Sequence, residues 1–231
     1  MDKDAGKRRA AEETASHIER GMTLGLGTGS TAAHFVDLVG ARVSKGWNLR
    51  GIPTSEDTRR HAERLGIPVI EPDETTIIDL AVDGADEADP DLNLIKGGGA
   101  ALLREKIIAR AARKFIVIAD KSKRVVKLGA FPLPIEISPF SWALTVAALR
   151  RTLSELGFEN APLDLRARDG APVKTDGGNL IIDASLSRID NPPALEAALV
   201  SIPGVLEVGL FCGMADMVIY GDENNVSVVK A

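Results

Sequence analysis

A glycine-rich loop joins an apolar run to a helical pattern near the start of the sequence, at Gly25-Leu26-Gly27-Thr28-Gly29-Ser30-Thr31. We expect a strand at Met22–Leu26 and a helix over Ala32–Val39. Free backbone N–H groups and the positive end of the helix dipole converge at such a junction. Glycines let an anion approach the backbone, and Ser30 and Thr31 add hydroxyl donors. The loop therefore has the chemistry of a phosphate-binding site.

The loop has three other interpretations: a Walker loop, a dinucleotide-binding loop, and a tight turn without a ligand. A Walker loop ends in Gly-Lys-Ser/Thr, and no lysine is present here. A dinucleotide loop has its third glycine one residue later and an acidic residue closing the second strand. The second predicted strand, Leu49–Pro53, is followed by Thr54 and Ser55, with Glu56 already at the helix start, which disfavours NAD. A tight turn that binds no ligand stays open from the loop alone.

A run of carboxylates, Asp83-Gly84-Ala85-Asp86-Glu87, follows a predicted buried strand at Ile77–Val82. Ligands of open parallel sheets bind at the carboxyl ends of the strands. Small residues between Asp83 and Asp86 leave room for a ligand, so we expect these two side chains to face it. Glu87 and Asp89 are expected to be solvated, the usual fate of an acidic run.

A lysine and a glutamate complete the set of reactive groups. Lys96 ends an apolar run and precedes Gly97-Gly98-Gly99, and Glu105 falls in a predicted helix, Ala100–Arg113. Taken singly, Lys96 is an exposed turn lysine and Glu105 pairs with its helix neighbours. Together with two aspartates, a carboxylate base and a cation can move a proton next to a carbonyl through an enediolate. The glycine loop then indicates a sugar phosphate.

The elements that position these groups alternate between strand and helix as far as Phe115–Ala119, which predicts an α/β fold with a parallel sheet covered on both faces. From Pro132 to Phe211 the order becomes β-α-β-β-α-β, the ferredoxin-like pattern. The predicted helices of that region are Phe140–Leu156 and Pro193–Ser201, the second capped by Asn191. Apolar runs at Met217–Tyr220 and Val226–Val229 are expected to return to the first domain.

Composition excludes several classes of protein. The net charge of the 231 residues is −5, which argues against nucleic acid as the main partner. A single cysteine, Cys212, excludes an internal disulfide and a thiolate zinc site, and the three histidines lack metal-ligand spacing. The uncharged stretch Gly21–Val36 contains four glycines and is no membrane span. With a charged start that leads into no apolar signal segment, we expect a soluble cytoplasmic protein with no membrane contact.

The motifs resemble those of the type A ribose-5-phosphate isomerase family over essentially the whole chain. They are Gly27–Thr31, Asp83–Glu87, Lys96–Ala101 with Arg104-Glu105-Lys106, Ala119–Lys123, Phe131–Pro134 and Ile202–Val205 with Val208–Phe211. The family interconverts ribose 5-phosphate and ribulose 5-phosphate in the non-oxidative pentose phosphate pathway, without metal or organic cofactor. Its architecture is a Rossmann-like domain with a smaller ferredoxin-like domain inserted near the C-terminus. The resemblance implies domains 1–131 with 212–231, and 132–211.

The resemblance also implies roles for individual residues. Glu105 resembles the catalytic base, and Asp83, Asp86 and Lys96 resemble the groups that open the ring and hold sugar oxygens. Substrate binding falls to a larger set: Thr28, Gly29, Ser30, Thr31, Gly84, Ala85, Gly97, Gly98, Gly99, Lys123 and Lys7. Family members are commonly dimers or tetramers, so a homo-oligomer is expected.

Two departures from the family pattern lie outside these motifs, at Ser141-Trp142-Ala143 and Cys212-Gly213-Met214. They leave open the details of the second domain and of oligomer contacts. Two other functional classes also stay open. A sugar-phosphate sensor would keep the glycine loop without needing Glu105, and an NAD-dependent oxidoreductase would need the missing ribose acid. The nearest enzyme alternative is another aldose–ketose phosphate isomerase.

Overall fold

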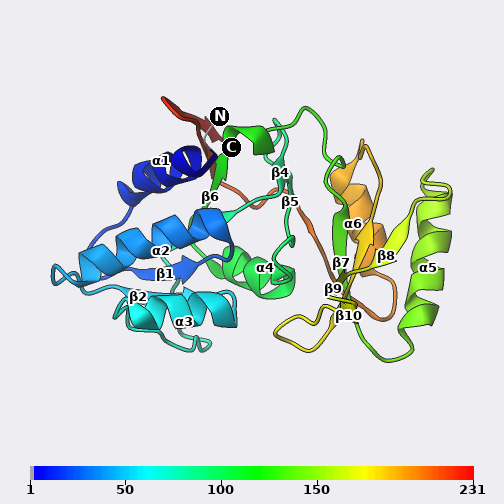
Figure 1. Cartoon of the computed structure of the whole chain (residues 1–231), viewed down its shortest axis with the longest axis horizontal. Coiled ribbons are helices and arrows are strands. Elements are labelled where there is room, and N and C mark those ends of the chain that lie inside the picture. Colours follow the sequence, from blue (N-terminus) through cyan, green and yellow to red (C-terminus); the bar gives the residue numbers. More distant parts are fainter. Residues whose placement is uncertain (1–2) are drawn as a thin grey trace. The chain divides into compact units, whose positions relative to one another are not determined.

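The computed structural model describes residues 3–231, and the chain forms two compact units. Unit 1 contains the chain up to Ala85, Arg104–Arg124 and Gly213–Ala231, and unit 2 contains Asp86–Leu103 and Val125–Cys212. Figure 1 shows the elements of both units along the chain. The fold is mixed α/β, with a mostly parallel central sheet in unit 1.

The unit 1 sheet has six strands in the order β15-β14-β6-β3-β1-β2. All neighbours pair in parallel except the last strand, β15, which is antiparallel to β14. The bounds are Thr23–Leu26 for β1, Arg50–Pro53 for β2, Leu80–Gly84 for β3, Phe115–Asp120 for β6, Met217–Gly221 for β14 and Val226–Lys230 for β15. Because β14 lies beside β6, the chain returns to this sheet after leaving unit 2, as the sequence predicts.

Helices of unit 1 lie on both faces of the sheet because side chains alternate along each strand. Leu24 and Leu26 of β1 point into an apolar core with Phe35. Gly25, between them, faces the other way, and a side chain there would overlap Ile108. The helices are α1 (Lys3–Ala15), α2 (Ser30–Val43), α3 (Glu56–Arg64), α4 (Leu102–Ala111, in unit 1 from Arg104) and the one-turn η1 (Lys121–Lys123).

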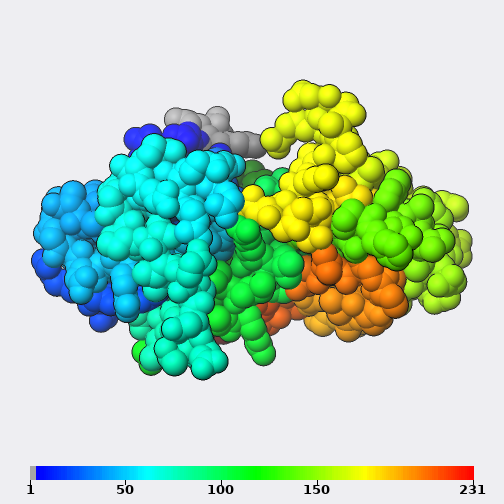
Figure 2. All heavy atoms as spheres, turned by 90° about the horizontal axis from the view of Figure 1, so that it is seen from below, coloured from blue at the N-terminus to red at the C-terminus, as the bar shows by residue number. Residues whose placement is uncertain are grey.

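Unit 2 is built on an antiparallel sheet in the order β12-β7-β11-β8, with two helices and a second apolar core. The bounds are Leu133–Ile137 for β7, Trp142–Glu155 for α5, Leu163–Leu165 for β8, Leu180–Ala184 for β11, Pro192–Val200 for α6 and Val205–Val208 for β12. A smaller sheet contains β4 (Glu87–Ala88), β5 (Leu94–Ile95) and β13 (Leu210–Phe211). The exposed hairpin β9 (Ala167–Arg168) and β10 (Ala171–Pro172) projects from this unit in Figure 2, in yellow.

The structure changes several predicted boundaries. The composition of residues 3–20 predicts a helix over that whole range, but the helix ends at Ala15. A strand predicted at Pro68–Ile70 is reduced to one bridge, between Val69 and Gly51. A strand predicted over Val205–Phe211 breaks at Gly209, where a side chain would overlap the carbonyl of Lys96. The sequence also predicts helix caps at Ser55 and Asn191, and both are confirmed, because Ser55 accepts from the Thr58 N–H and Asn191 from the Ala194 N–H.

Unit 2 is larger than the range 132–211 expected for the second domain. It also takes in Asp86–Leu103 and Val125–Phe131. The reason is strand pairing, since β5 is hydrogen-bonded to both β4 and β13 and so ties the residues after Ala85 to the end of the unit. Within residues 3–231, no helix is both long and apolar enough to cross a membrane.

Candidate active site

Strands β1, β3 and β6 are parallel neighbours, so their carboxyl ends meet at one edge of the unit 1 sheet. The Thr28 loop follows β1, Asp83 and Gly84 end β3, and Lys123 follows β6 in η1. Asp120 is buried and caps η1 by accepting from the Ser122 N–H at 3.0 Å. The structure therefore gathers three of the predicted substrate-binding segments at the edge where α/β sheets bind ligands.

Asp83 holds the glycine loop. Its side chain is 3% exposed, and Oδ1 accepts from the N–H of Thr28 at 3.0 Å and of Gly84 at 2.7 Å. A side chain at Gly27 would overlap the Asp83 carboxyl group. The glycine is therefore required for the loop to lie against the carboxylate.

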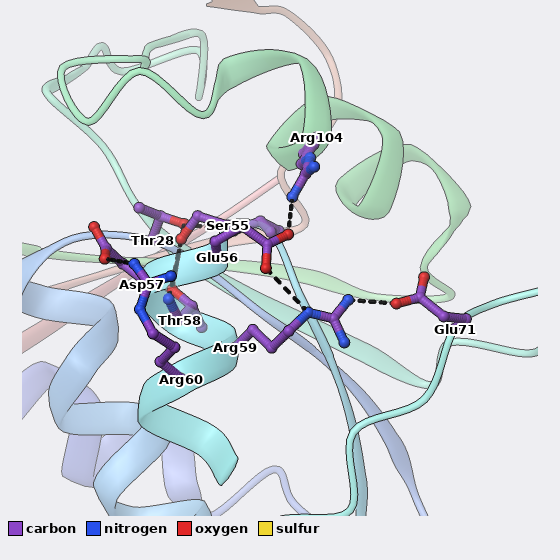
Figure 3. Close-up of polar contacts among 10 residues, drawn as sticks. Thr28, Ser55, Glu56, Asp57, Thr58, Arg59, Arg60, Glu71 and Arg104 are labelled. Atoms are coloured by element: carbon purple, nitrogen blue, oxygen red, sulfur yellow. Dashed lines mark hydrogen bonds and ion pairs between the residues drawn. The ribbon is translucent and has the colours of Figure 1, made fainter. Parts of the chain in front are cut away.

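The Thr28 hydroxyl lies in a cluster of hydroxyl groups that sequence reasoning missed. Its Oγ1 is 2.8 Å from Thr54 Oγ1 and donates to Ser55 Oγ at 2.8 Å. Thr58 closes the cluster by donating to the Gly27 carbonyl at 3.0 Å. All three partners are buried, and they come from the turn after β2 and the start of α3. Figure 3 shows Thr28 and Ser55 facing one another.

The start of α2 is open to a ligand. Gly29 occupies the N-cap position with φ +106°, where a glycine is favoured, and without a side chain it accepts no hydrogen bond from the helix N–H groups. Ser30 is exposed and accepts from Lys7 Nζ at 2.9 Å, while Thr31 is partly buried. The structure thus brings Lys7 of α1 to the loop.

Glu105 lies in the first turn of α4 and is 4% exposed. Asp83 lies beside it, because both residues line one narrow space, too small for a water molecule, that Gly25, Gly27 and Ile108 also line. Glu105 is therefore a buried carboxyl group beside the glycine loop, and not the solvated helix residue that it would be on its own.

The residue before it, Arg104, links α4 to the start of α3. Arg104 Nη1 donates to Glu56 Oε1 at 2.8 Å, Glu56 also pairs with Arg59, and Arg59 pairs with Glu71 (Figure 3). The hydrogen bond from Arg104 holds the pKa of the Glu56 carboxyl below its ordinary value. Because these side chains are partly exposed, we expect the network to contribute little to stability.

Unit 2 holds a second glycine loop and its own aspartate. Asp86 Oδ2 accepts from the N–H of Gly98 at 2.8 Å, and its own N–H donates to the Ile95 carbonyl. Lys96 is 2% exposed, with Nζ 5.3 Å from the centre of the Phe211 ring. Gly97 has φ +107°, and Gly98 and Gly99 are exposed. This unit therefore groups Asp86, Lys96 and the three glycines.

Two expectations about the acidic run are wrong. Glu87 and Asp89 are 4% and 6% exposed, so neither is solvated. Glu87 accepts from the N–H groups of Gly129 and Phe131, each at 2.7 Å, and Asp89 accepts from those of Asp91 and Asn93. Each carboxylate replaces water with backbone donors, which makes its burial favourable.

Among residues 3–231, no group of three or more His, Cys, Asp or Glu side chains has a geometry that could hold a metal ion. His34 contacts Asp4 at 3.1 Å and His61 contacts Asp37 at 2.8 Å. The helical pattern over residues 3–20 predicts that His17 is helical, but it lies just beyond the end of α1, in a turn.

The comparisons with known proteins decide the family. The family model of ribose 5-phosphate isomerase A (phosphoriboisomerase A) matches residues 50–225. A ribose-5-phosphate isomerase A of Rhodopseudomonas palustris is 51% identical over 231 residues, covering 100% of this chain and 99% of the relative. The chain belongs to the ribose 5-phosphate isomerase A family. A member from Nitrobacter hamburgensis is 50% identical over 230 residues, with 100% and 99% covered.

Solved structures of ribose 5-phosphate isomerases share the fold. One, a D-ribose-5-phosphate isomerase in complex with phospho-erythronic acid, has a TM-score of 0.92 and 44% identity, with both chains covered completely. The enzyme of Plasmodium falciparum has a TM-score of 0.93 and 31% identity, with 99% of each chain covered. The mixed α/β fold of this family member is therefore that of the family.

Proposed function

We propose that the chain interconverts D-ribose 5-phosphate and D-ribulose 5-phosphate by proton transfer through an enediolate. The observation that carries the proposal is the burial of Glu105 beside Asp83, at the sheet edge that also holds the phosphate loop. The relatives named ribose-5-phosphate isomerase A support it, as does the related enzyme structure with a four-carbon phosphorylated acid bound.

Glu105 is the base in this proposal. After the ring opens to the aldehyde, its carboxylate takes the proton from C2 and the C1–C2 enediolate forms. The same carboxyl group then delivers the proton to C1, while the proton of O2 passes to O1. The ketose product has the same atoms as the aldose. A positioned base of this kind contributes about 10²–10⁴-fold to the rate.

The other predicted groups bind the sugar oxygens and stabilise the charge that develops on them. Ring opening moves the O1 proton to the ring oxygen, and we assign this step and the holding of sugar hydroxyls to Asp83 and Asp86. The Lys96 ammonium group stabilises the negative charge that develops on O1. The backbone of Gly97–Gly99, with Gly84, Ala85 and Lys123, contacts the sugar.

The phosphate is assigned to the start of α2. Gly29, Ser30 and Thr31 have N–H and hydroxyl groups at the positive end of the helix. Lys7 Nζ donates a hydrogen bond to the Ser30 hydroxyl. Anchoring the far end of the substrate turns binding energy into orientation of C1 and C2 over Glu105. No cofactor enters this mechanism.

Finer features of the fold and assembly are part of the same proposal. The order β12-β7-β11-β8 with chain order β-α-β-β-α-β supports a ferredoxin-like unit inserted in a Rossmann-like one. We further propose a cytoplasmic homo-oligomer, a dimer or tetramer.

The direct test is formation of ribulose 5-phosphate from ribose 5-phosphate by the purified protein, with EDTA present. We expect turnover of ribose 5-phosphate and much slower turnover of hexose phosphates. Binding of ribose 5-phosphate without turnover would instead indicate a sugar-phosphate sensor, and faster turnover of another aldose phosphate would replace the substrate.

A further inference from the structure

Arg166, a residue that no sequence motif singles out, binds the backbone of the second glycine loop. It follows β8, and its Nη1 donates to the carbonyl of Gly97 at 2.7 Å and to that of Gly98 at 3.2 Å. The other side of the guanidinium binds Asp183 of β11, with Nε donating to Oδ2 at 2.8 Å and Nη2 to Oδ1. The Arg166 side chain is 14% exposed, so this is not a solvated surface pair.

The first of these contacts completes a grip on one peptide group. The Gly97 carbonyl and the Gly98 N–H belong to the same planar peptide. Arg166 binds the carbonyl, and Asp86 Oδ2 binds the N–H at 2.8 Å. A cation at the oxygen and an anion at the nitrogen match the two ends of the peptide dipole. The plane of this peptide is therefore fixed from both sides.

The second contact orients the next peptide. In a trans peptide the carbonyl and the N–H point in opposite directions, so Arg166 on the Gly98 carbonyl turns the Gly99 N–H away from itself. The positive charge at the oxygen also makes that N–H a stronger donor. Three consecutive glycines have more backbone freedom to lose than any other tripeptide, so such a loop needs an external anchor.

We infer that Arg166, held by Asp183, is a positioning residue that presents the Lys96–Gly99 loop to the substrate. The inference rests on the proposed function, because it takes the loop as the contact for sugar oxygens. It gives the four-stranded sheet of unit 2 a part in the reaction, since Arg166 directly follows β8 and Asp183 lies in the neighbouring strand β11. Lysine cannot replace the planar fork that reaches two carbonyls and a carboxylate at once.

A purely structural role makes a different prediction. Arg166 and Asp183 also tie two strands together, and loss of that tie alone would lower the thermal midpoint without changing the kinetics of the folded enzyme. Kinetic constants and affinity for phospho-erythronic acid, measured well below the midpoint, separate the two roles.

The experiment compares Arg166→Ala, Arg166→Lys and Asp183→Asn with Arg168→Ala, which removes an exposed arginine of the β9–β10 hairpin. We expect Arg166→Ala to lower kcat/KM about 10²-fold, the cost of a small misplacement of binding groups, and to weaken analogue binding. The kcat/KM values of Arg166→Lys and Asp183→Asn should lie between those of Arg166→Ala and wild type, and the kcat/KM of Arg168→Ala should equal that of wild type. Millimolar guanidinium or methylguanidinium should restore part of the Arg166→Ala activity.

The inference is overturned if folded Arg166→Ala keeps kcat/KM and analogue affinity within about twofold of wild type, or if its loss matches only the unfolded fraction. Failure of the proposed function looks different. In that case the wild type itself does not turn over ribose 5-phosphate, and the effect of Arg166 is still measurable as binding of phospho-erythronic acid.

Discussion

Two glycine loops, one in each unit, are held by the two aspartates of a single short motif. In unit 1, Asp83 accepts from the Thr28 N–H, and in unit 2, Asp86 accepts from the Gly98 N–H. In both loops a glycine lies against the carboxylate, at Gly27 and Gly98. The same device, a carboxylate bound to a glycine-loop N–H, therefore serves both units, three residues apart in the chain.

The remaining anchors of the two loops differ. The first loop is completed by neutral hydroxyls, with Thr28 bound by Thr54 and Ser55. The second is completed by a cation, Arg166, on its carbonyls. Beyond Asp83, the Thr28 side chain of the first loop is thus held by neutral hydroxyl groups, whereas one peptide group of the second loop is held between opposite charges, Asp86 and Arg166.

The largest expected effect on stability is the difference between alanine substitutions at Gly27 and at Gly98. At Gly27 an added methyl group meets both the side chain and the backbone of Asp83, whereas at Gly98 it meets only the end of the Asp86 side chain, which can turn. We expect Gly27→Ala to lower the free energy of unfolding by about 2–3 kcal/mol and Gly98→Ala by about 1 kcal/mol. Urea denaturation checks this, and equal losses would show that the two anchors are equally rigid.

A smaller effect tests the hydroxyl cluster. Thr28→Val keeps the shape of the side chain but leaves two buried hydroxyls without this partner, and we expect a loss of about 1–2 kcal/mol. Thr28→Ser keeps the hydroxyl and is the matched control, with an expected loss under about 1 kcal/mol. If Val and Ser behave alike in urea denaturation, the hydroxyl does not anchor the loop.

The smallest effect concerns pH and lies outside both loops. Burial, aided by the charge of Lys114, lowers the pKa of His17 below its ordinary value of 6.5. The unfolded chain then binds the proton more readily, so stability is complete above about pH 6.5 and declines as the pH falls below it. His17→Gln should make this decline shallower in urea titrations between about pH 5 and pH 7. An unchanged slope would assign the decline to other groups.

The sequence predicts which reactive residues lie at the strand ends, but not which residues hydrogen-bond to them and hold them in place. Alternating apolar runs that end in Gly27, Asp83 and Lys96 place reactive groups at strand ends, because strand polarity follows from the α/β pattern. Which strands are neighbours does not follow from the pattern. The placing of Thr54 and Ser55 under Thr28 depends on β2 lying beside β1, so their part in the site was missed.

Long-range partners explain the other differences. Arg166 and Gly97 are 69 residues apart in the chain, and the sequence around neither residue predicts their contact. Glu87 looks like part of a solvated acidic run, but its two backbone donors, Gly129 and Phe131, come from a distant segment. Ser55 at a helix start predicts a cap, but nothing in the local pattern indicates that its hydroxyl also accepts from Thr28.

The most direct test of the account compares Glu105→Gln with wild type and with Glu155→Gln, an exposed glutamate at the end of α5. Conversion of ribose 5-phosphate is measured alongside binding of phospho-erythronic acid. We predict that Glu105→Gln lowers kcat by about 10³-fold or more while analogue affinity stays near that of wild type, and that Glu155→Gln changes neither. A Glu105→Gln enzyme with kcat within about tenfold of wild type would contradict the role of Glu105 as the base.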